Sequence, residues 1–239
     1  MSIEILLIAL IVLLASFTQG FSGFGFQLVT LSLLSFFVDL KFAIPLCALL
    51  GLAINVYLII SLREHIKIFE LKRLIIGSII GIPLGVYFLS EADPHLIKLL
   101  LGIVLLIFVG ISSTKIIKTN GLNVKWGYLF GLVSGLLGGA FNTNGPPVLI
   151  YFHLQGWDKF KLKASITGFF IFSSVLIVAS HLVSGLTDSS ILTNSLYYLP
   201  SVILGQFLGK IMFNRISSEV YHKFILSFLA IVAGIMIFG

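Results

Sequence analysis

A short polar run interrupts an apolar stretch of the chain, and its side chains could bind an anion. Asn142, Thr143 and Asn144 come directly before Gly145 and Pro146. Asparagine and threonine are preferred caps of helix starts, and proline is favoured at the first helical position, so the run predicts a helix that begins here. A helix start presents unpaired N–H groups and partial positive charge, which bind an anion without a charged side chain. We therefore predict an anion site made of amides, a hydroxyl and backbone donors.

A second stretch, rich in glycine, repeats this arrangement in the first half of the chain. Gly23 and Gly25 precede an apolar segment, and Ser22 and Gln27 could add side-chain hydrogen bonds. Two such helix starts facing each other could hold one tetrahedral or pyramidal oxyanion. The predicted substrate-binding residues are Ser22, Gly23, Phe24, Gly25, Phe26, Gln27, Asn142, Thr143, Asn144, Gly145 and Pro146.

A purely structural explanation competes with binding at both stretches. Glycines in membrane helices usually serve close packing, and prolines often only kink a helix. Packing explains the glycine-rich stretch as well as binding does, whereas two asparagines and a threonine in lipid need partners and favour a site. Asn55 and Lys210 are further candidates. An interhelical hydrogen bond explains Asn55 equally well, Lys210 is expected to extend to the membrane surface, and His181 is expected to be interfacial.

The elements that must carry these residues are membrane helices. Of 239 residues, 58% are hydrophobic and 10% are charged, whereas a soluble domain carries charge on about a quarter of its residues. Several apolar runs reach the roughly 20 residues that span a bilayer. The predicted segments are 3–19, 26–38, 42–62, 71–90, 96–114, 124–139, 146–154, 163–184, 192–213 and 219–238. The formal charge of +6 comes from short basic clusters between segments, which indicates cytoplasmic loops rather than nucleic-acid binding.

Five segments fall in each half, and the two halves share a glycine pattern. Gly20, Gly23, Gly25 and Phe26 recur as Gly135, Gly138, Ala140 and Phe141, and Gly81, Gly85 and Gly110 match Gly205, Gly209 and Gly234. The constant spacing predicts two repeats, 1–118 and 124–239. The positions of the basic loops make the third segment of each repeat cross in opposite directions, so we expect inverted repeats. Lys41 is the one basic loop residue that argues against this orientation.

The first two segments of each repeat look too short to span a bilayer before a glycine or proline interrupts them. We therefore expect an all-α polytopic membrane protein in which these segments form broken or re-entrant helical hairpins. Irregular backbone at membrane depth is tolerated only where protein buries it or where it lines a cavity. The predicted site lies where the two hairpins meet, between the repeats.

Through these stretches the chain resembles the TauE/SafE family of sulfite exporters, over nearly its whole length. The resemblance rests on Gln19-Gly-Phe-Ser-Gly-Phe-Gly-Phe-Gln27 and, more specifically, on Gly135-Leu-Leu-Gly-Gly-Ala-Phe-Asn-Thr-Asn-Gly-Pro-Pro147. It implies a multi-pass protein of the bacterial cytoplasmic (inner) membrane that exports sulfite, or a related organosulfonate or thiosulfate. The family motif often carries a third glycine where this chain has Ala140 or Phe141.

The charges within the chain suggest how such an anion would be driven. All nine acidic residues lie in predicted loops or at segment ends, so a carboxylate relay for protons is not expected. With the cell interior negative, an anion that leaves gains about 2.3 kcal/mol per charge per 100 mV. We predict electrogenic, facilitated efflux of a sulfur oxyanion, sulfite first, without a cofactor or a metal ion. Alternating access and a gated channel-like path both fit, and transport of sulfoacetate, another organosulfonate or thiosulfate, including uptake, is the alternative.

Two other classes of protein compete with a transporter. An intramembrane enzyme needs a nucleophile with a base, paired carboxylates or a metal cluster. No His-x-x-x-His motif, cysteine pair or aspartate pair occurs in an apolar segment, so we predict that the chain is not an enzyme. A non-transporting scaffold subunit would explain the packing glycines but not the polar run. The expected partners are the small anion and the lipid bilayer, and glycine-rich outer helices would permit a homodimer.

Overall fold

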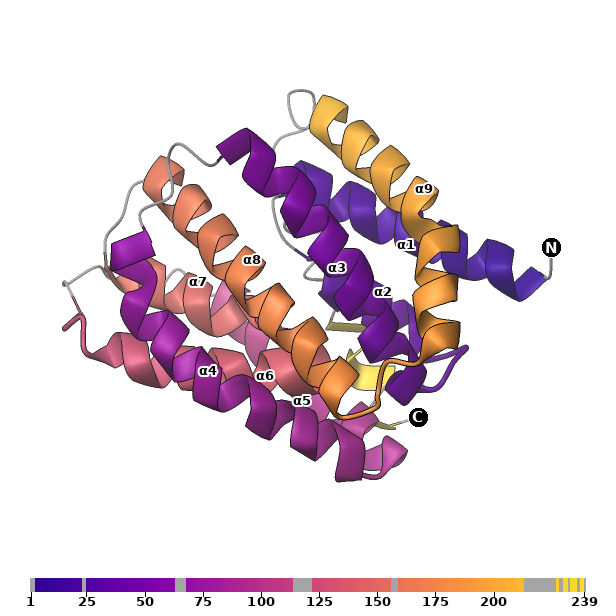
Figure 1. Ribbon diagram of the computed structural model, residues 1–239, viewed down its shortest axis with the longest axis horizontal. Coiled ribbons are helices and arrows are strands. Elements are labelled where there is room, and N and C mark those ends of the chain that lie inside the picture. The colour runs from indigo at the N-terminus through magenta and orange to yellow at the C-terminus, as the bar shows by residue number, and fades with distance from the viewer. Residues whose placement is uncertain are drawn as a thin grey trace. The chain divides into compact units, whose positions relative to one another are not determined.

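The computed structural model describes residues 3–22, 25–62, 68–113, 122–155 and 159–212, with short pieces between 227 and 238. The regular structure within these ranges is helical (Figure 1). The described helices are α1 (Ile3–Ser22), α2 (Phe26–Leu34), α3 (Leu40–Leu62), α4 (Ile68–Glu91), α5 (Pro94–Ser113), α6 (Trp126–Phe141), α7 (Gly145–Leu154), α8 (Lys159–Val183) and α9 (Ser189–Met212).

These helices correspond to the first nine predicted segments, and the tenth, 219–238, lies largely outside the described residues. α1 continues past its predicted end at residue 19, and its 20 residues are enough to cross a bilayer. The segment is therefore longer than we expected of a hairpin arm. α2 and α7 have only 9 and 10 residues, and at 1.5 Å per residue neither reaches the roughly 30 Å of a hydrocarbon core. Their entry as re-entrant hairpins stays a prediction.

Five of the helices contain a stretch long and apolar enough to cross a membrane. These stretches are Glu4–Phe21, Leu40–Leu58, Leu71–Glu91, Pro94–Ile111 and Ser165–Val183. α9 has the length but is less apolar, since it carries Asn194, Gln206 and Lys210. The prediction of an all-helical protein with several candidate membrane spans is confirmed for the described part of the chain.

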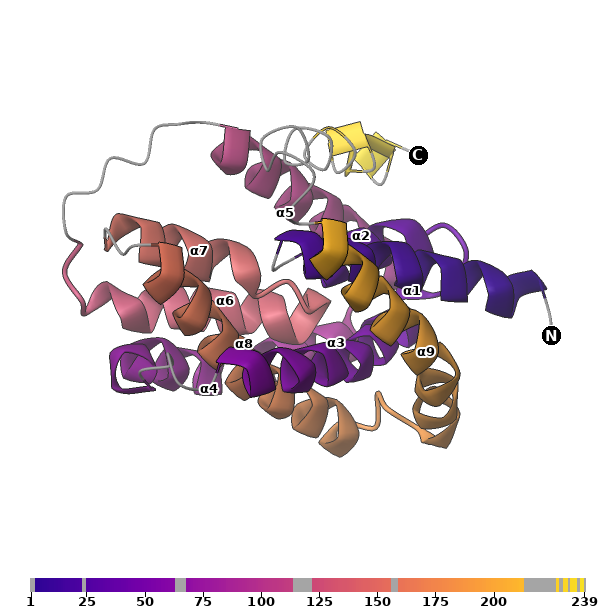
Figure 2. The same cartoon turned by 90° about the horizontal axis from the view of Figure 1, so that it is seen from above.

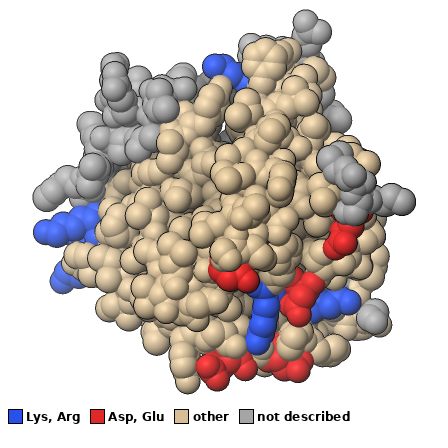
Figure 3. Space-filling view, turned by 45° about the vertical axis from the view of Figure 1, so that its right-hand side comes forward, with Lys and Arg blue, Asp and Glu red and all other residues tan. Residues whose placement is uncertain are grey.

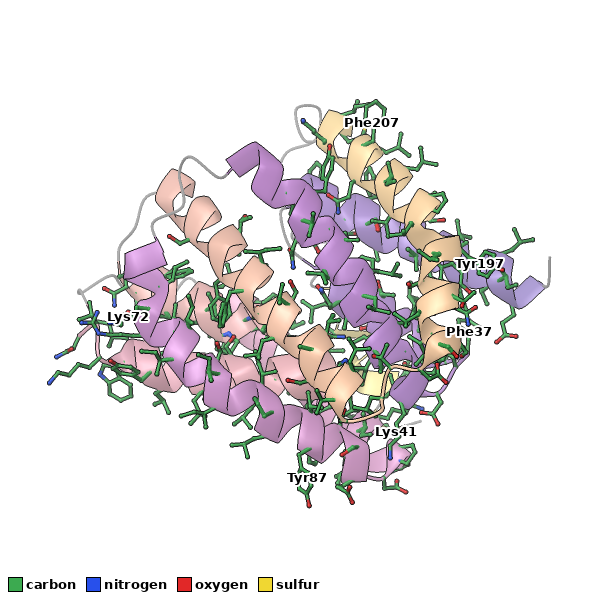
Figure 4. The ribbon with its side chains drawn as sticks, in the orientation of Figure 1. Phe37, Lys41, Lys72, Tyr87, Tyr197 and Phe207 are labelled. Atoms are coloured by element: carbon green, nitrogen blue, oxygen red, sulfur yellow. The ribbon has the colours of Figure 1, made fainter. Side chains whose placement is uncertain are left out.

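The surface of the helices is apolar where lipid is expected. Leu6, Leu10 and Leu14, each one turn from the next on α1, are about half exposed. The side chains of Tyr87 on α4 and Phe207 on α9 are more exposed still and lie on the outer sides of their helices (Figure 4). On the face that Figure 3 displays, the charged side chains gather toward its lower part and left edge, and uncharged side chains cover a broad area between them. Large exposed apolar side chains are normal in a protein whose solvent is a bilayer.

The chain divides into two compact units. Unit 1 contains α1, α2, the first part of α3, α5 and α9, and unit 2 contains the rest of α3 together with α4, α6, α7 and α8. The boundary within α3 lies between Leu50 and Gly51. Each unit therefore combines helices from both halves of the sequence.

Unit 2 is held together by α4 and α6, which lie side by side (Figures 1 and 2). A side-chain carbon on Gly77 or Gly85 of α4 would overlap a backbone carbonyl oxygen of α6, and one on Gly139 of α6 would overlap the carbonyl of Ile82. Glycines four residues apart thus let the two backbones meet directly, as small residues do in membrane helix pairs. Gly81, Gly131 and Gly135 belong to the same contact.

Unit 1 is built on the corresponding pair, α1 with α9. A side-chain carbon on Gly20 would lie 2.6 Å from the carbonyl oxygen of Gln206, and one on Gly205 would lie 2.6 Å from the β carbon of Ser16. Gly209 would overlap the carbonyl of Phe17. The packing role that we weighed for Gly20 is therefore confirmed.

The same pairing recurs in both units. The fourth helix of the first half, α4, packs on the first helix of the second half, α6, and the fourth helix of the second half, α9, packs on the first helix of the first half, α1. The compact units consequently differ from the predicted repeats 1–118 and 124–239, whose inverted relation stays a prediction.

Candidate functional site

The polar run of the second half forms the junction between α6 and α7 in unit 2. α6 ends at Phe141, and Asn142 adopts a left-handed conformation with a φ of 52°. The backbone N–H of Asn142 donates to the carbonyl of Gly138 at 2.8 Å, and that of Thr143 donates to the carbonyl of Leu137 at 3.2 Å. Asparagine is one of the few residues that tolerates this conformation. Asn142 therefore stops α6 and redirects the chain into α7.

Asn144 is fixed on both its backbone and its side chain. The hydroxyl of Ser134 on α6 donates to the carbonyl of Asn144 at 2.6 Å. The side-chain amide nitrogen of Asn144 donates to the hydroxyl of Ser173 on α8, also at 2.6 Å. A side-chain carbon on Gly138 would lie 3.0 Å from the β carbon of Asn144, so a glycine there gives Asn144 room against α6. The amide of Asn144 is thus preorganised by α6 and α8.

The accessible surface at this junction belongs to Asn144 and Gly145, which are partly exposed. Asn142 and Thr143 are buried, with 4% and 2% of their surface exposed. The hydroxyl of Thr143 donates to the carbonyl of Phe141 at 3.0 Å. Asn142 and Thr143 therefore shape the turn, while Asn144 and Gly145 carry the surface that is accessible at this junction.

Prolines limit which backbone donors the start of α7 offers. α7 begins at Gly145, so Pro146 is its second residue rather than its first as predicted. The first four N–H groups of a helix have no partner within it, but Pro146 and Pro147 have no N–H. Among the first three residues of α7, Gly145 alone therefore has an N–H to offer. A side-chain carbon on Gly145 would make only an ordinary contact, 3.4 Å from Phe170, so packing does not require glycine there.

A chain of hydrogen bonds links this junction to α3. The hydroxyl of Ser173 donates to the carbonyl of Phe170 at 3.2 Å, and the side-chain nitrogen of Asn55 on α3 donates to the same carbonyl at 3.4 Å. Since Ser173 also accepts from Asn144, the Phe170 carbonyl and the Ser173 hydroxyl connect the two asparagines. Asn55, predicted as a weaker candidate, thus joins the network of Asn144 through a contact between α3 and α8.

His181 lies further along the same helix and is fully buried. Its Nε2 atom is 3.4 Å from the carbonyl oxygen of Gly139 on α6. α6 covers this part of α8, so the ring of His181 does not reach the protein surface, and its interfacial depth stays a prediction. Ser173, Ile177 and His181 are four residues apart and share one face of α8, and a side-chain carbon on Gly138 would lie 3.2 Å from Ile177.

The corresponding junction in unit 1 joins α1 to α2 and is built differently. Gly25 has a φ of 103°, which favours glycine strongly. The backbone N–H of Phe26, the first residue of α2, donates to the side-chain oxygen of Gln19 at 3.2 Å. Phe26 is fully buried and Gln27 is half-buried. Gly23, Phe24 and the side chain of Ser22 lie outside the described residues.

Comparison with known proteins establishes the family to which the chain belongs. Residues 8–236 match the family model described as "Sulfite exporter TauE/SafE". The chain belongs to the TauE/SafE family. A curated relative from Cupriavidus necator, named a probable sulfite/organosulfonate exporter TauE, is 25% identical over 204 residues, which cover 82% of this chain and 78% of that relative. No solved structure matches the chain.

Membership of TauE/SafE makes the chain a multi-pass membrane protein of a transporter family, as the sequence resemblance predicted. Identity of 25% with the curated relative supports the family and leaves the cargo to be established.

Sequence reasoning missed the residues of this TauE/SafE chain that hold the polar run. Ser134 and Ser173 anchor Asn144, and Gln19 bonds the first N–H of α2. Serines on apolar helices gave no distinct signal, because their hydroxyls often bond only their own helix.

Lys210 lies in the last turn of α9 with its side chain exposed. Its predicted role in binding, like those of Ser22 to Gln27, stays a prediction.

Proposed function

We propose that this TauE/SafE protein exports a sulfur oxyanion across the bacterial cytoplasmic membrane by electrogenic, facilitated efflux, with sulfite as the first substrate to test. The observation that carries the proposal is the α6–α7 junction. There the amide of Asn144 is held in place by Ser134 and Ser173, beside the partly exposed start of α7 at Gly145. A fixed amide next to a helix start suits an oxyanion without the cost of a buried countercharge.

The strength of such a site fits a transporter, which must release what it binds. A hydrogen bond to a charged group contributes about 1.5–3 kcal/mol, and a helix start adds about 0.3–1 kcal/mol, or up to about 2 when partly buried. Two such bonds therefore give roughly millimolar affinity. A buried arginine or lysine would hold the anion more tightly and would also need a partner in the empty state.

The membrane potential is a sufficient driving force in this proposal. At an inside-negative potential of 100 mV, one negative charge gains about 2.3 kcal/mol on leaving, which is about a fiftyfold gradient. The placement of carboxylates supports uncoupled transport. Asp39 and Asp93 stand directly before α3 and α5, where their side chains accept the N–H groups of Lys41 and His95. Asp188 likewise directly precedes α9.

Flux measurements on the purified protein in proteoliposomes test this function. A potential of either sign is imposed with a potassium gradient and valinomycin, while pH is clamped on both sides. The proposal expects sulfite to move toward the positive side, to reverse when the potential is reversed, and to outpace chloride. Sulfite flux that requires a proton gradient would refute the uncoupled mechanism. No flux of sulfite, thiosulfate or sulfoacetate under any gradient would favour a non-transporting scaffold.

A second candidate function is transport of another sulfur anion. The curated relative is named for organosulfonates as well as for sulfite, and a site of one amide and a helix start recognises the oxyanion group rather than the rest of the solute. Organosulfonate export, and uptake of thiosulfate, belong to this candidate. The same vesicles, loaded inside or outside with each anion, separate the substrates and the directions.

The predicted repeats enter the proposal as its structural basis. In each unit, the fourth helix of one half packs on the first helix of the other half. This matching arrangement supports the proposal that the halves 1–118 and 124–239 descend from one duplicated unit. We further propose that the α1–α2 junction contributes to binding much more weakly than Asn144 does, through Ser22, Gly23, Phe24, Gly25, Phe26 and Gln27. We also propose that Lys210 draws anions toward the protein and that the protein forms a homodimer.

A further inference from the structure

A buried acceptor lies in the network of Asn144 without a hydrogen-bond partner. Asn55 is 4% exposed, and its side-chain oxygen has no partner in the described part of the protein. His181, on the same face of α8 as Ser173, shows the same deficit at its Nδ1 atom. A buried polar atom without a partner is costly, and more so at membrane depth. Ser16, Ser32, Thr187 and Gln206 carry such atoms as well, but among the described residues with this deficit only Asn55 shares a hydrogen-bond partner with the network of Asn144.

The chemistry of the missing partner follows from the atoms that are already bonded. The side-chain nitrogen of Asn55 faces the carbonyl of Phe170, and a carbonyl can only accept, so the group turned to it is the NH2. The atom without a partner is then the amide oxygen. The carbonyl of Gly139 in the same way makes Nε2 of His181 the protonated nitrogen, which leaves Nδ1 of the neutral ring as an acceptor. Both atoms therefore need a group that donates a hydrogen bond to them.

Asn55 is close to the proposed anion site along a continuous path. It shares the Phe170 carbonyl with Ser173, and Ser173 holds the amide of Asn144. Phe170 also lies against Gly145, where an added side-chain carbon would be 3.4 Å from its ring. The amide of Asn144, which would donate to an oxyanion, and the oxygen of Asn55 therefore belong to one hydrogen-bonded network of α3, α8 and the α6–α7 turn.

We propose that Asn55 is a specificity-determining residue, and that the transported solute is a sulfur oxyanion that itself donates a hydrogen bond to the Asn55 side-chain oxygen. This inference rests on the proposed transport function. Hydrogensulfite, which carries one hydrogen, and an organosulfonate with a hydroxyl group both have this chemistry. Fully deprotonated sulfite and sulfate offer only acceptors, so their oxygens would face the lone pairs of Asn55. A site that hydrogen-bonds a substrate group rejects the analogue that lacks it.

Two sulfonates that differ by one hydroxyl group test the inference. Ethanesulfonate and 2-hydroxyethanesulfonate carry the same single charge, so flux at one pH isolates the donor. We expect wild-type protein in proteoliposomes to transport the hydroxylated sulfonate about tenfold faster at low concentration, the factor that one satisfied hydrogen bond contributes. Asn55→Leu should bring the ratio of the two rates close to one. Ser78→Ala, which removes a buried hydroxyl that bonds Ile75 within α4, should leave the ratio at its wild-type value.

Sulfite provides the second arm, which separates the inorganic source of the donor from the organic one. Initial sulfite flux is measured at several pH values, equal on both sides, and divided by ethanesulfonate flux to remove any titration of the protein. Flux that follows the concentration of hydrogensulfite supports an inorganic donor, and hydroxyl preference alone supports an organic one.

The outcomes separate this inference from the function on which it rests. Equal rates for the two sulfonates in wild-type protein, together with sulfite flux that follows the dianion, would overturn the donor requirement while transport itself stands. An unchanged ratio in Asn55→Leu would also overturn it, because the hydroxyl group would then not be recognised by Asn55. A structural water would be the partner of the Asn55 oxygen in that case. If no sulfur anion moves at all, both the function and the inference fall. The ratio of the two sulfonate rates in wild-type protein tests the donor requirement even if the Asn55 variant does not fold.

Discussion

The α6–α7 junction and the α1–α2 junction carry similar sequence motifs but leave different groups accessible. In unit 1 the first N–H of α2 is bonded to Gln19, and Gly25 makes the turn in a left-handed conformation. In unit 2 Asn142 makes the turn, the buried network holds Asn144, and Gly145 begins α7 partly exposed. The first N–H of α2 is bonded to the protein's own side chain, whereas the start of α7 leaves Asn144 and Gly145 partly exposed. Repeated motifs can therefore share a turn without sharing a function.

The largest effect is expected where both units depend on glycine. Gly139→Val and Gly209→Val should each abolish recovery of folded protein, because a side chain would overlap a backbone carbonyl of the facing helix. Gly110→Val is the matched control, since nothing lies within 4 Å of a side-chain carbon there. Size-exclusion profiles and thermal unfolding in detergent measure this. Normal unfolding of the Gly139 variant would mean that α4 and α6 do not pack as described.

The support of Asn144 should matter more for flux than for folding. Ser173→Ala removes the acceptor of the Asn144 amide, so we expect sulfite flux to fall roughly tenfold, in line with the loss of about 1–1.5 kcal/mol of orientation. Ser174→Ala is the control, because the hydroxyl of Ser174 bonds Ile171 within its own helix. Equal flux in the two variants would refute the positioning role of Ser173.

Glycine should act through different properties at the two junctions. Gly145→Ala adds a carbon at an ordinary contact distance beside the start of α7, so we expect KM for sulfite to rise about threefold with little change in thermal stability. Gly25→Ala should instead lower stability by about 1–2 kcal/mol because of its left-handed backbone, with KM nearly unchanged. Michaelis curves together with melting curves separate these effects. The reverse pattern would contradict the assignment of binding to unit 2.

The smallest effect is expected at the cap of α2. Gln19→Leu removes the acceptor of the Phe26 N–H and should lower the free energy of unfolding by about 1 kcal/mol, as the loss of a helix cap does. Sulfite affinity should stay at the wild-type value, which flux against concentration measures. A large loss of affinity would show that unit 1 binds the anion as directly as unit 2.

Much of the fold could be predicted from the sequence, because long apolar runs and their interruptions determine where membrane helices begin and end. The starts of α2 and α7 fell where glycine and proline indicated, and Gly81, Gly85, Gly205 and Gly209 marked the close helix pairs. The partners of those helices were not predictable. Hydropathy describes each segment by itself, and only the structure shows that α4 packs on α6 and α9 on α1.

The candidate site was predicted in location more than in composition. The polar run Asn142 to Asn144 was found because such side chains are rare in apolar segments. Which of them would be accessible depended on the left-handed turn at Asn142, which buries its side chain and that of Thr143. Ser173 gained its significance from Asn144, and His181 gained its own from the carbonyl of Gly139 on α6. Contacts between distant segments are what a single sequence does not reveal.

The most direct test of the account compares potential-driven sulfite efflux in Asn144→Ala and Gln27→Ala, reconstituted at equal amounts of folded protein. Asn144 and Gln27 are the polar side chains that stand beside the helix starts of units 2 and 1. If the α6–α7 junction binds the anion, the Asn144 variant should lose more than about 90% of the wild-type rate, corresponding to at least 1.4 kcal/mol, while the Gln27 variant keeps most of it. Full flux in Asn144→Ala would contradict the central claim.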